Sequence, residues 1–144
     1  MIEFQSLDVD MPNIDFEIIK KWIKEVVSLH NRIVGPLTYQ FCNDEHIIEV
    51  NRKFLDHDFF TDIITFDYTR KNRISGDMLI SLDTVASNAE MLKLPYEQEL
   101  HRVIIHGVLH LCGINDKAEG EREIMEMHEN EALKIFDELK KNKQ

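Results

Sequence analysis

The stretch from residue 100 to residue 116 constrains the fold more than any other part of the sequence. It is apolar around nearly the whole circumference of a helix, and it carries His106 and His110 four residues apart. Positions i and i+4 lie one turn apart on the same helix face, so the two imidazoles point into one space. A helix that is apolar on all sides is normally buried. The stretch therefore predicts a buried helix with two histidines on one face.

Gly113 follows three residues after His110, where a helix can end in a left-handed residue at little steric cost. The chain can then turn back and bring the carboxylate of Asp116 to the two imidazoles. Two imidazoles and one carboxylate make a three-ligand metal site with an open position, which is typical of a catalytic metal. We therefore expect one divalent metal ion bound by His106, His110 and Asp116, with Cys112 as a less favoured further ligand.

Gly107 bears on the class of reaction. The spacing from His106 to Asp116 is that of the metzincin zinc proteases, in which a Glu follows the first histidine and a third His ends the motif. In those proteases the Glu is the general base, and glycine has no group that could replace it. The sequence therefore disfavours a peptidase. A glycine within a helix costs about 1 kcal/mol relative to alanine, so a strand or a substrate is expected to approach the helix closely at this position.

Length and composition limit the remaining possibilities. A chain of 144 residues fits one domain, covering residues 1–144. The net charge of −10 argues against a protein that coats nucleic acid non-specifically. No apolar run approaches the roughly 18 residues that a membrane span needs, and the first residues do not resemble a signal peptide. We therefore expect a cytoplasmic protein without a membrane partner.

Hydrophobic periodicity and turn residues predict nine elements in the order β-α-β-α-β-β-α-α-α. The expected strands cover residues 2–7, 37–42, 61–68 and 78–82, and the expected helices cover residues 15–30, 43–54, 83–93, 95–111 and 121–140. Gly35-Pro36 is expected to form a turn. The expected caps are Asp15 for the first helix, Asn43 or Asp44 for the second, and Asp83 or Thr84 for the third. The inward face of the last helix is expected to hold Ile124, Met127, Ala132, Ile135, Phe136 and Leu139. This pattern predicts a single α/β (α+β) domain with a sheet of about four strands, mostly antiparallel or mixed, covered by about five helices, and a metal site at the end of the buried helix.

Several segments together resemble the YbeY family of bacterial endoribonucleases that mature ribosomal RNA. Residues 106–113, with the sequence HGVLHLCG, are similar to the family signature HGxLHLxGYDH. The segments TDIITF at 61–66 and GDMLI at 76–80 resemble the TDVLSF and GDI strands of the family, and residues 51–54 resemble the end of its NxxY helix. The resemblance covers roughly residues 45–136 in the expected order.

The resemblance implies a single α/β domain and a zinc-type ion held by three histidines. It also implies hydrolytic cleavage of single-stranded RNA, maturation of the 3′ end of 16S rRNA, ribosome quality control, and a ribosome or ribosomal proteins as partners. Carried over to this chain, the first two ligands are His106 and His110, and the third position holds Asp116 in place of the usual His. A carboxylate weakens selectivity for zinc because harder metals also bind oxygen well.

A second departure concerns the residue after the second helix. The family commonly has an Arg there, which could bind a phosphate or stabilise negative charge, but this chain has Leu55. His57 is the first candidate for a catalytic substitute, and Arg52, Arg70 and Arg73 are further candidates. The histidines His30, His46, His101 and His128 are expected on the surface or at the rim of the core.

Three questions stay open at this level. A metal of this kind lowers the pKa of a water that could attack a phosphodiester, but activation of the ribose 2′-OH is an alternative route. A non-catalytic ribosome-assembly factor that keeps the metal is the main rival to a nuclease. Two histidines and a carboxylate are also the ligand set of non-haem iron oxygenases, although those ligands usually lie on barrel strands, which this chain lacks.

Overall fold

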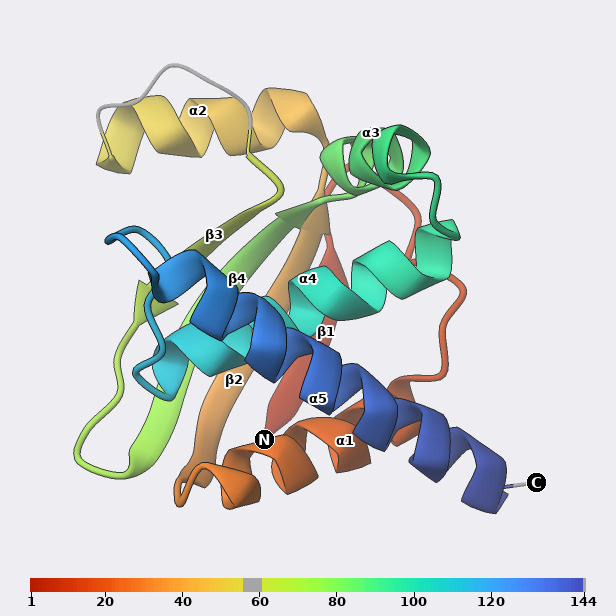
Figure 1. Ribbon diagram of the computed structural model, residues 1–144. Helices are drawn as coiled ribbons and strands as arrows, with labels where there is room; N and C mark the ends of the chain where they lie inside the picture. The colour runs from red at the N-terminus through yellow and green to blue at the C-terminus, as the bar shows by residue number, and fades with distance from the viewer. Residues whose placement is uncertain (56–60, 144) are drawn as a thin grey trace.

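The computed structural model describes residues 1–55 and 61–143 of the chain, which form one α+β domain (Figure 1). The elements, in chain order, are β1 (Ile2–Ser6), α1 (Phe16–Leu29), β2 (Ile33–Cys42), α2 (Asp44–Phe54), β3 (Ile63–Asp67), β4 (Arg73–Ser81), α3 (Leu82–Leu92), α4 (Tyr96–Leu111) and α5 (Glu121–Lys143). The predicted order of strands and helices is therefore confirmed for the part of the chain that the structure describes.

The four strands form one mixed sheet in the order β1-β2-β4-β3. Strands β1, β2 and β4 are parallel, whereas β3 pairs with β4 in antiparallel fashion, as a hairpin requires. The predicted turn at Gly35-Pro36 is wrong, because β2 continues through it with a shift in register. Gly35 lacks a side chain that would otherwise lie 2.6 Å from the carbonyl oxygen of Ile74, and the Pro36 carbonyl accepts a hydrogen bond from Ser75 Oγ.

Side-chain caps fix where the first three helices begin. Asp15 and Asn43 each accept a hydrogen bond from a backbone N–H three residues later, as predicted for α1 and α2. The prediction for α3 is wrong: the cap is Ser81, the last residue of β4, which accepts from the amide of Thr84. Asp83 instead accepts a hydrogen bond from the backbone of Asp44, which links the starts of α2 and α3.

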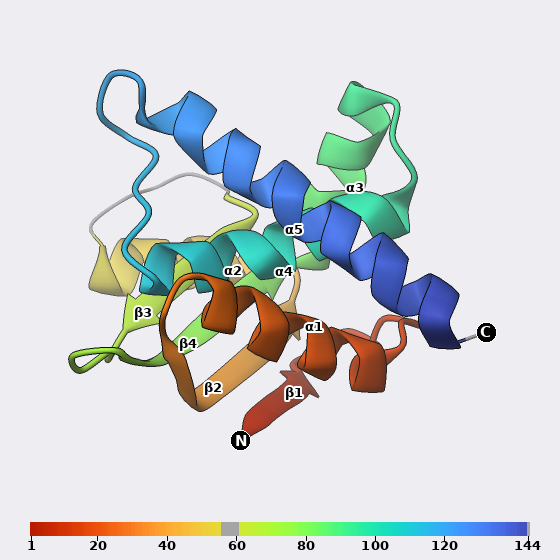
Figure 2. The same ribbon diagram turned by 60° about the horizontal axis from the view of Figure 1, so that its bottom comes forward.

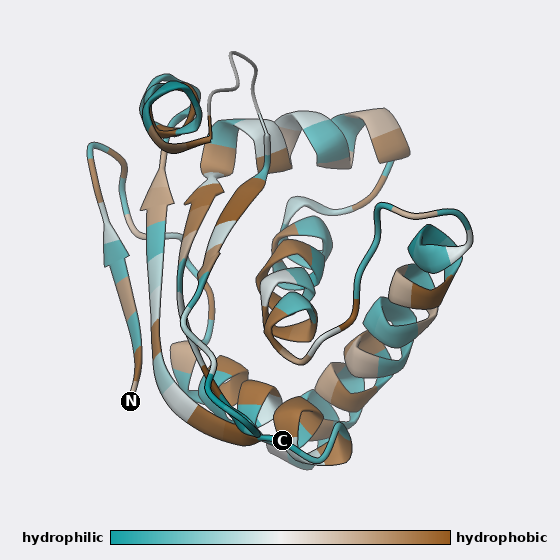
Figure 3. Cartoon of the chain, turned by 90° about the vertical axis from the view of Figure 1, so that its left-hand side faces the viewer, coloured by the Kyte–Doolittle hydropathy of each residue, from teal (hydrophilic) through white to brown (hydrophobic). Residues whose placement is uncertain are grey.

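Helix α4 is buried because it lies between two layers. It packs on β3 and β4 on one side and on α5 on the other, with α1 and α3 along its flanks (Figures 2 and 3). Its apolar residues contribute to the main core, and the hydroxyl of the buried Tyr39 on β2 donates to the carbonyl of Ile104 on α4. A smaller apolar cluster of Cys42, Ile47 and Ile64 covers the opposite face of the sheet under α2. The predicted buried helix is confirmed.

The inward face predicted for α5 is confirmed at Ala132, Phe136, Ile135 and Leu139, which are buried or packed against the core, but it is wrong at two positions. Its buried positions are Met125, Glu129, Ala132 and Phe136. Ile124 and Met127 were predicted to point inward, but they are 50% and 51% exposed. The helix also continues to residue 143 instead of ending near residue 140. In the part of the chain that the structure describes, no helix combines the length and apolar character that crossing a bilayer requires.

Candidate metal centre

The end of α4 reverses the chain as the sequence predicted. Gly113 has a φ of +96°, in the left-handed region that a side chain would disfavour. Its amide donates to the carbonyl of His110, and the next amide, from Ile114, donates to the carbonyl of Leu109. These two bonds are the Schellman pattern, which satisfies the last carbonyls of a helix. The chain therefore turns back directly after α4 and carries Asp116 to the histidine face.

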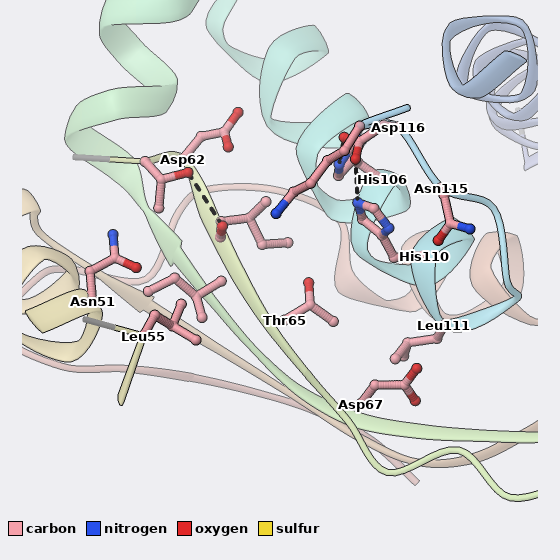
Figure 4. Close-up of a pocket in the computed structure, with 14 residues that line it drawn as sticks. Asn51, Leu55, Asp62, Thr65, Asp67, His106, His110, Leu111, Asn115 and Asp116 are labelled. Carbon is pink, nitrogen blue, oxygen red and sulfur yellow. Dashed lines mark hydrogen bonds and ion pairs between the residues drawn. The ribbon is translucent and has the colours of Figure 1, made fainter. Parts of the chain in front are cut away.

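Three side chains converge at this point (Figure 4). Nε2 of His106 lies 3.3 Å from Oδ2 of Asp116, and Nε2 of His110 lies 3.5 Å from Oδ1 of Asp116. The two imidazoles are nearly perpendicular, with ring centroids 4.6 Å apart. One ligand atom from each residue lies within 4.8 Å of the other two. Ligands of a tetrahedral zinc ion with bonds of about 2.0–2.1 Å lie about 3.4 Å from one another, so these separations fit a divalent ion.

The polar atoms of the cluster are incompletely satisfied without a cation. Oδ1 of Asp116 is buried and makes no hydrogen bond to any residue that the structure describes. Burial and the neighbouring His106 lower the pKa of His110, an effect that Asp116 opposes. A lowered pKa favours the neutral imidazole that metal binding needs. His106, His110 and Asp116 could therefore hold a divalent metal ion.

The cluster opens into a cavity of about 590 Å³. The strand β3 and the end of α2 form one wall, and the segment after α4 forms the other (Figure 4). Leu55, which is 42% exposed, lines the cavity at the end of α2. Lys117 is the only cationic residue among the described residues that line it, and its side chain is exposed. The cavity is thus open to solvent and has one positive charge beside the metal ligands.

Asp62 lies where this cavity meets a second one. The second cavity, of about 360 Å³, shares Asp62, His106 and Asp116 with the first. Burial raises the pKa of the Asp62 carboxyl, while His106 and Arg102 oppose that rise. Asn88 donates a hydrogen bond of 3.4 Å to Oδ2 of Asp62. The site therefore contains a further half-buried carboxyl group near the three candidate ligands.

Comparison with models of known protein families identifies the family of this chain. The family model for Endoribonuclease YbeY matches residues 3–137, which is most of the chain. The chain belongs to the YbeY family. It is 59% identical over 136 residues to the Endoribonuclease YbeY of Phocaeicola vulgatus, covering 94% of this chain and 99% of that protein. It is 56% identical over 137 residues to that of Parabacteroides distasonis, covering 95% and 96%.

A solved structure supports the same fold. A Thermotoga maritima protein whose structure was determined in solution superimposes with a TM-score of 0.63 at 23% sequence identity. The superposition covers 96% of this chain and 93% of that one. Because the identity is low, this likeness concerns the fold alone. The arrangement of sheet and helices is thus shared with a protein of much lower sequence identity than the two relatives named above.

Gly107 of the YbeY-like signature has a packing role in this chain. A Cβ at this position would lie 2.8 Å from Sδ of Met78 and 2.9 Å from Cδ1 of Ile63. These side chains come from β4 and β3, so the close approach predicted for Gly107 is that of strands. The glycine lets α4 lie directly on the sheet and sets the depth of His106 beside it.

The predicted substitutes for the YbeY-family arginine do not gather at the cavity. His57 lies outside the described residues. Arg52, Arg70 and Arg73 are not among the described residues that line the cavity. The backbones of Arg70 and Arg73 form an isolated antiparallel bridge at the turn between β3 and β4. Lys117 does line the cavity, but it was not predicted as a substitute for the arginine, although it directly follows the third candidate ligand.

Two other expectations need revision or limits. Cys112 is buried, and burial raises the pKa of its thiol to about 11, against a weaker effect of Arg32. Its sulfur is not part of the ligand cluster found among the described residues. His101 was expected near the surface but is only 5% exposed, because its ring packs against Phe136 and Trp22.

Sequence reasoning also missed Glu129. This residue of α5 is 2% exposed, and its Oε2 lies 2.6 Å from Nδ1 of His106. The signal was present in the sequence, because residues 125, 129, 132 and 136 follow helical spacing and place a glutamate within an otherwise apolar face. A buried carboxylate requires a partner, so that position called for a cation or a hydrogen-bond donor nearby.

Proposed function

We propose that this YbeY-family protein is a metal-dependent endoribonuclease that hydrolyses phosphodiester bonds in single-stranded RNA. One observation carries the proposal: two imidazoles and a carboxylate converge at the wall of an open cavity of about 590 Å³. Relatives that share more than half of their residues with this chain bear the name Endoribonuclease YbeY. The site geometry and the family membership thus support the same class of reaction.

We propose that His106, His110 and Asp116 hold one divalent ion, with zinc as the first candidate. Such an ion, when bound, lowers the pKa of a water molecule and stabilises negative charge that develops on a phosphate. The mixed nitrogen and oxygen ligand set fits zinc but also admits harder metals such as manganese.

The other residues of the cavity suit a phosphate backbone. Lys117 supplies a positive charge beside the ligands, which attracts a phosphate. Thr65 also lines the cavity and offers a hydroxyl group that could bond a sugar or phosphate oxygen. Leu55 leaves the opposite wall without the charge that an arginine would supply, so we expect modest affinity for RNA. We propose that Asp62, which lines the cavity, exchanges a proton there.

The biological setting follows from the family resemblance. We propose that the substrate is ribosomal RNA, that the protein acts in maturation of the 16S 3′ end and in ribosome quality control, and that it does so in the cytoplasm beside the ribosome. A non-catalytic assembly factor is not favoured, because the three candidate ligands line an open cavity that leaves room for a substrate.

The direct test is cleavage of a short, fluorescent, single-stranded RNA by protein reconstituted with zinc or manganese. Endonucleolytic products are expected with the wild type, whereas His106→Ala should lose activity by at least a factor of 100. His46→Ala is the matched control, since His46 lies on α2 and is not among the described residues that line the cavity. Cleavage that persists in His106→Ala would contradict the site, and a metal-loaded wild type without activity would favour the assembly factor.

The same assay separates the two nucleophiles. A substrate with a single 2′-deoxyribose on the 5′ side of the cleaved bond cannot use its 2′-OH. Cleavage of this substrate with an ordinary 3′ or 5′ phosphate end points to water as the nucleophile. Protection of that bond, together with 2′,3′-cyclic phosphate products from unmodified RNA, points to the 2′-OH.

A further inference from the structure

A series of buried charged side chains leads to the back of the candidate metal centre. Glu99 on α4 is fully buried, and its two carboxylate oxygens accept hydrogen bonds of 2.8 and 2.6 Å from Arg102. Arg102 donates a further bond of 3.1 Å to Oε1 of Glu129 on α5. Oε2 of Glu129 lies 2.6 Å from Nδ1 of His106. The series therefore ends at the imidazole whose other nitrogen faces Asp116.

We propose that Glu129 is a positioning residue for the metal centre, and that the Glu99–Arg102 pair holds it in place. Glu129 accepts the Nδ1–H of His106, which leaves Nε2 unprotonated and directed toward the metal ion. This inference rests on the proposed metal site. It adds a requirement from α5, a helix that supplies none of the three candidate ligands.

The tautomer of an imidazole depends on the partner of each nitrogen. A carboxylate at Nδ1 fixes the proton there, sets the plane of the ring and raises the basicity of Nε2 as a ligand. The distance of 2.6 Å is short for a bond between nitrogen and oxygen, as charge-assisted bonds are. The geometry is thus that of a carboxylate–histidine–metal arrangement.

Burying these charges costs free energy, and orientation of the His106 imidazole explains why they are there. Burial acts to lower the pKa of Arg102, but Glu99 and Glu129 raise it, so the guanidinium stays charged between two carboxylates. Buried ion groups rarely stabilise a fold more than apolar residues of the same volume would. Packing of α5 does not need them, since Met125 and Phe136 are buried on the same helix and Trp22 Nε1 donates to the Ala132 carbonyl at 2.6 Å. Packing therefore does not explain the buried charges of Arg102 and Glu129, whereas orientation of the His106 imidazole does.

The test measures metal affinity by competition with a chromophoric chelator, with zinc and with cobalt as probes. Glu129→Gln keeps the size of the side chain and one acceptor oxygen but removes the charge. We expect it to weaken zinc binding by about 10- to 100-fold. Because the amide also loses one acceptor for Arg102, the melting temperature of the metal-free protein should fall, and affinity is measured well below it. Glu123→Gln is the control, because Glu123 is an exposed glutamate on the same helix. It should leave the zinc affinity unchanged.

Spectroscopy gives a second test, whose first part uses the wild type alone. Nitrogen-15 NMR of the zinc-loaded wild type should report a protonated Nδ1 and a metal-bound Nε2 for His106. In Glu129→Gln the cobalt absorption spectrum should change in position or intensity, which a purely structural role for Glu129 would leave unaltered.

The outcomes separate this inference from the proposed function. Wild type that binds neither zinc nor cobalt stoichiometrically would contradict the metal site itself. Wild type that binds zinc, together with a Glu129→Gln variant whose affinity lies within twofold of it, would overturn the role of Glu129 alone. Metal bound through Nδ1 of His106 would do the same.

Discussion

Nε2 of His106 lies 3.3 Å from Oδ2 of Asp116, although a helix end and a reversal of the chain separate the two residues. Gly113 makes this proximity possible, since its positive φ turns the chain back after α4. The pair brings a helix ligand and a loop ligand together, so the stability of the loop after α4 should depend on the metal.

Metal removal should therefore lower stability. A zinc ion at 100 times its dissociation constant stabilises the folded state by about 2.7 kcal/mol, if it binds only that state. We expect the melting temperature to fall on treatment with a chelator and to recover with added zinc. His110→Ala should abolish the response to zinc in the same thermal scan, and a variant that still responds fully would show that His110 is not a ligand.

Asp116→His should change the metal preference. A third imidazole replaces an oxygen ligand with a nitrogen ligand, which favours zinc over manganese. We expect the ratio of zinc to manganese affinity, measured by competitive titration, to rise by at least tenfold relative to wild type. An unchanged ratio would indicate that Asp116 does not contact the metal.

Leu55→Arg should strengthen RNA binding. Leu55 lines the cavity and is 42% exposed, so an arginine there can extend toward a phosphate without burying its charge. A contact with one more phosphate increases the slope of log affinity against log salt by about 0.7 for single strands. Lys117→Met should decrease the slope by a similar amount. Fluorescence anisotropy over a range of salt concentrations measures both.

Gly107→Ala should destabilise the protein despite the higher helix propensity of alanine. The new methyl group would lie within 3.0 Å of Met78 and Ile63. Overpacking costs about 1–3 kcal/mol, and the gain in propensity returns about 1 kcal/mol. We expect the free energy of unfolding, measured in urea, to fall by about 1 kcal/mol. The cost of Gly107→Ala should be smaller when it is introduced into a Met78→Val background. A stabilised Gly107→Ala variant would contradict the close packing.

His101 should make the fold sensitive to acid. Burial lowers its pKa, and Lys140 adds to this effect, whereas Glu97 and Asp137 oppose it. Because the folded-state pKa lies below the unfolded value of about 6.5, the unfolded state binds more protons and stability falls as the pH drops below that value. The full stability is present above it.

His101→Phe should reduce this dependence. It places an apolar ring between Trp22 and Phe136 and eliminates the buried Nε2 atom, which has no hydrogen-bond partner among the described residues. Urea unfolding at pH 5 and pH 8 should show a smaller difference in the variant than in the wild type. His46→Gln on α2 serves as the control, and an equal decrease in that control would rule out His101 as the source.

Local signals explain why much of the site was predictable. The i, i+4 spacing of His106 and His110, together with the helix stop at Gly113, depends on neighbours within ten residues. Binary patterning likewise predicted the mixed sheet and the buried α4. Membership of the YbeY family confirms the resemblance on which the RNA hypothesis was based.

Features that depend on distant contacts were missed. Glu129 meets His106 across two helices, 23 residues apart in sequence. Both faces of α5 carry large apolar residues, so composition alone did not distinguish the buried Met125 from the exposed Met127. Gly35 was interpreted as a turn residue, whereas the neighbouring strand β4 explains its lack of a side chain.

The hydrogen bond from Trp22 to Ala132 spans 110 positions of the chain. Synthesis proceeds from the N-terminus, so the part of the apolar face of α1 that packs on α5 stays uncovered until α5 has left the ribosome. Glu129 arrives with the same helix. A nascent chain, or one cleaved before Glu121, therefore lacks the carbonyl that accepts from Trp22 and the carboxylate that contacts His106. We therefore expect the metal centre to be complete only after α5 has docked.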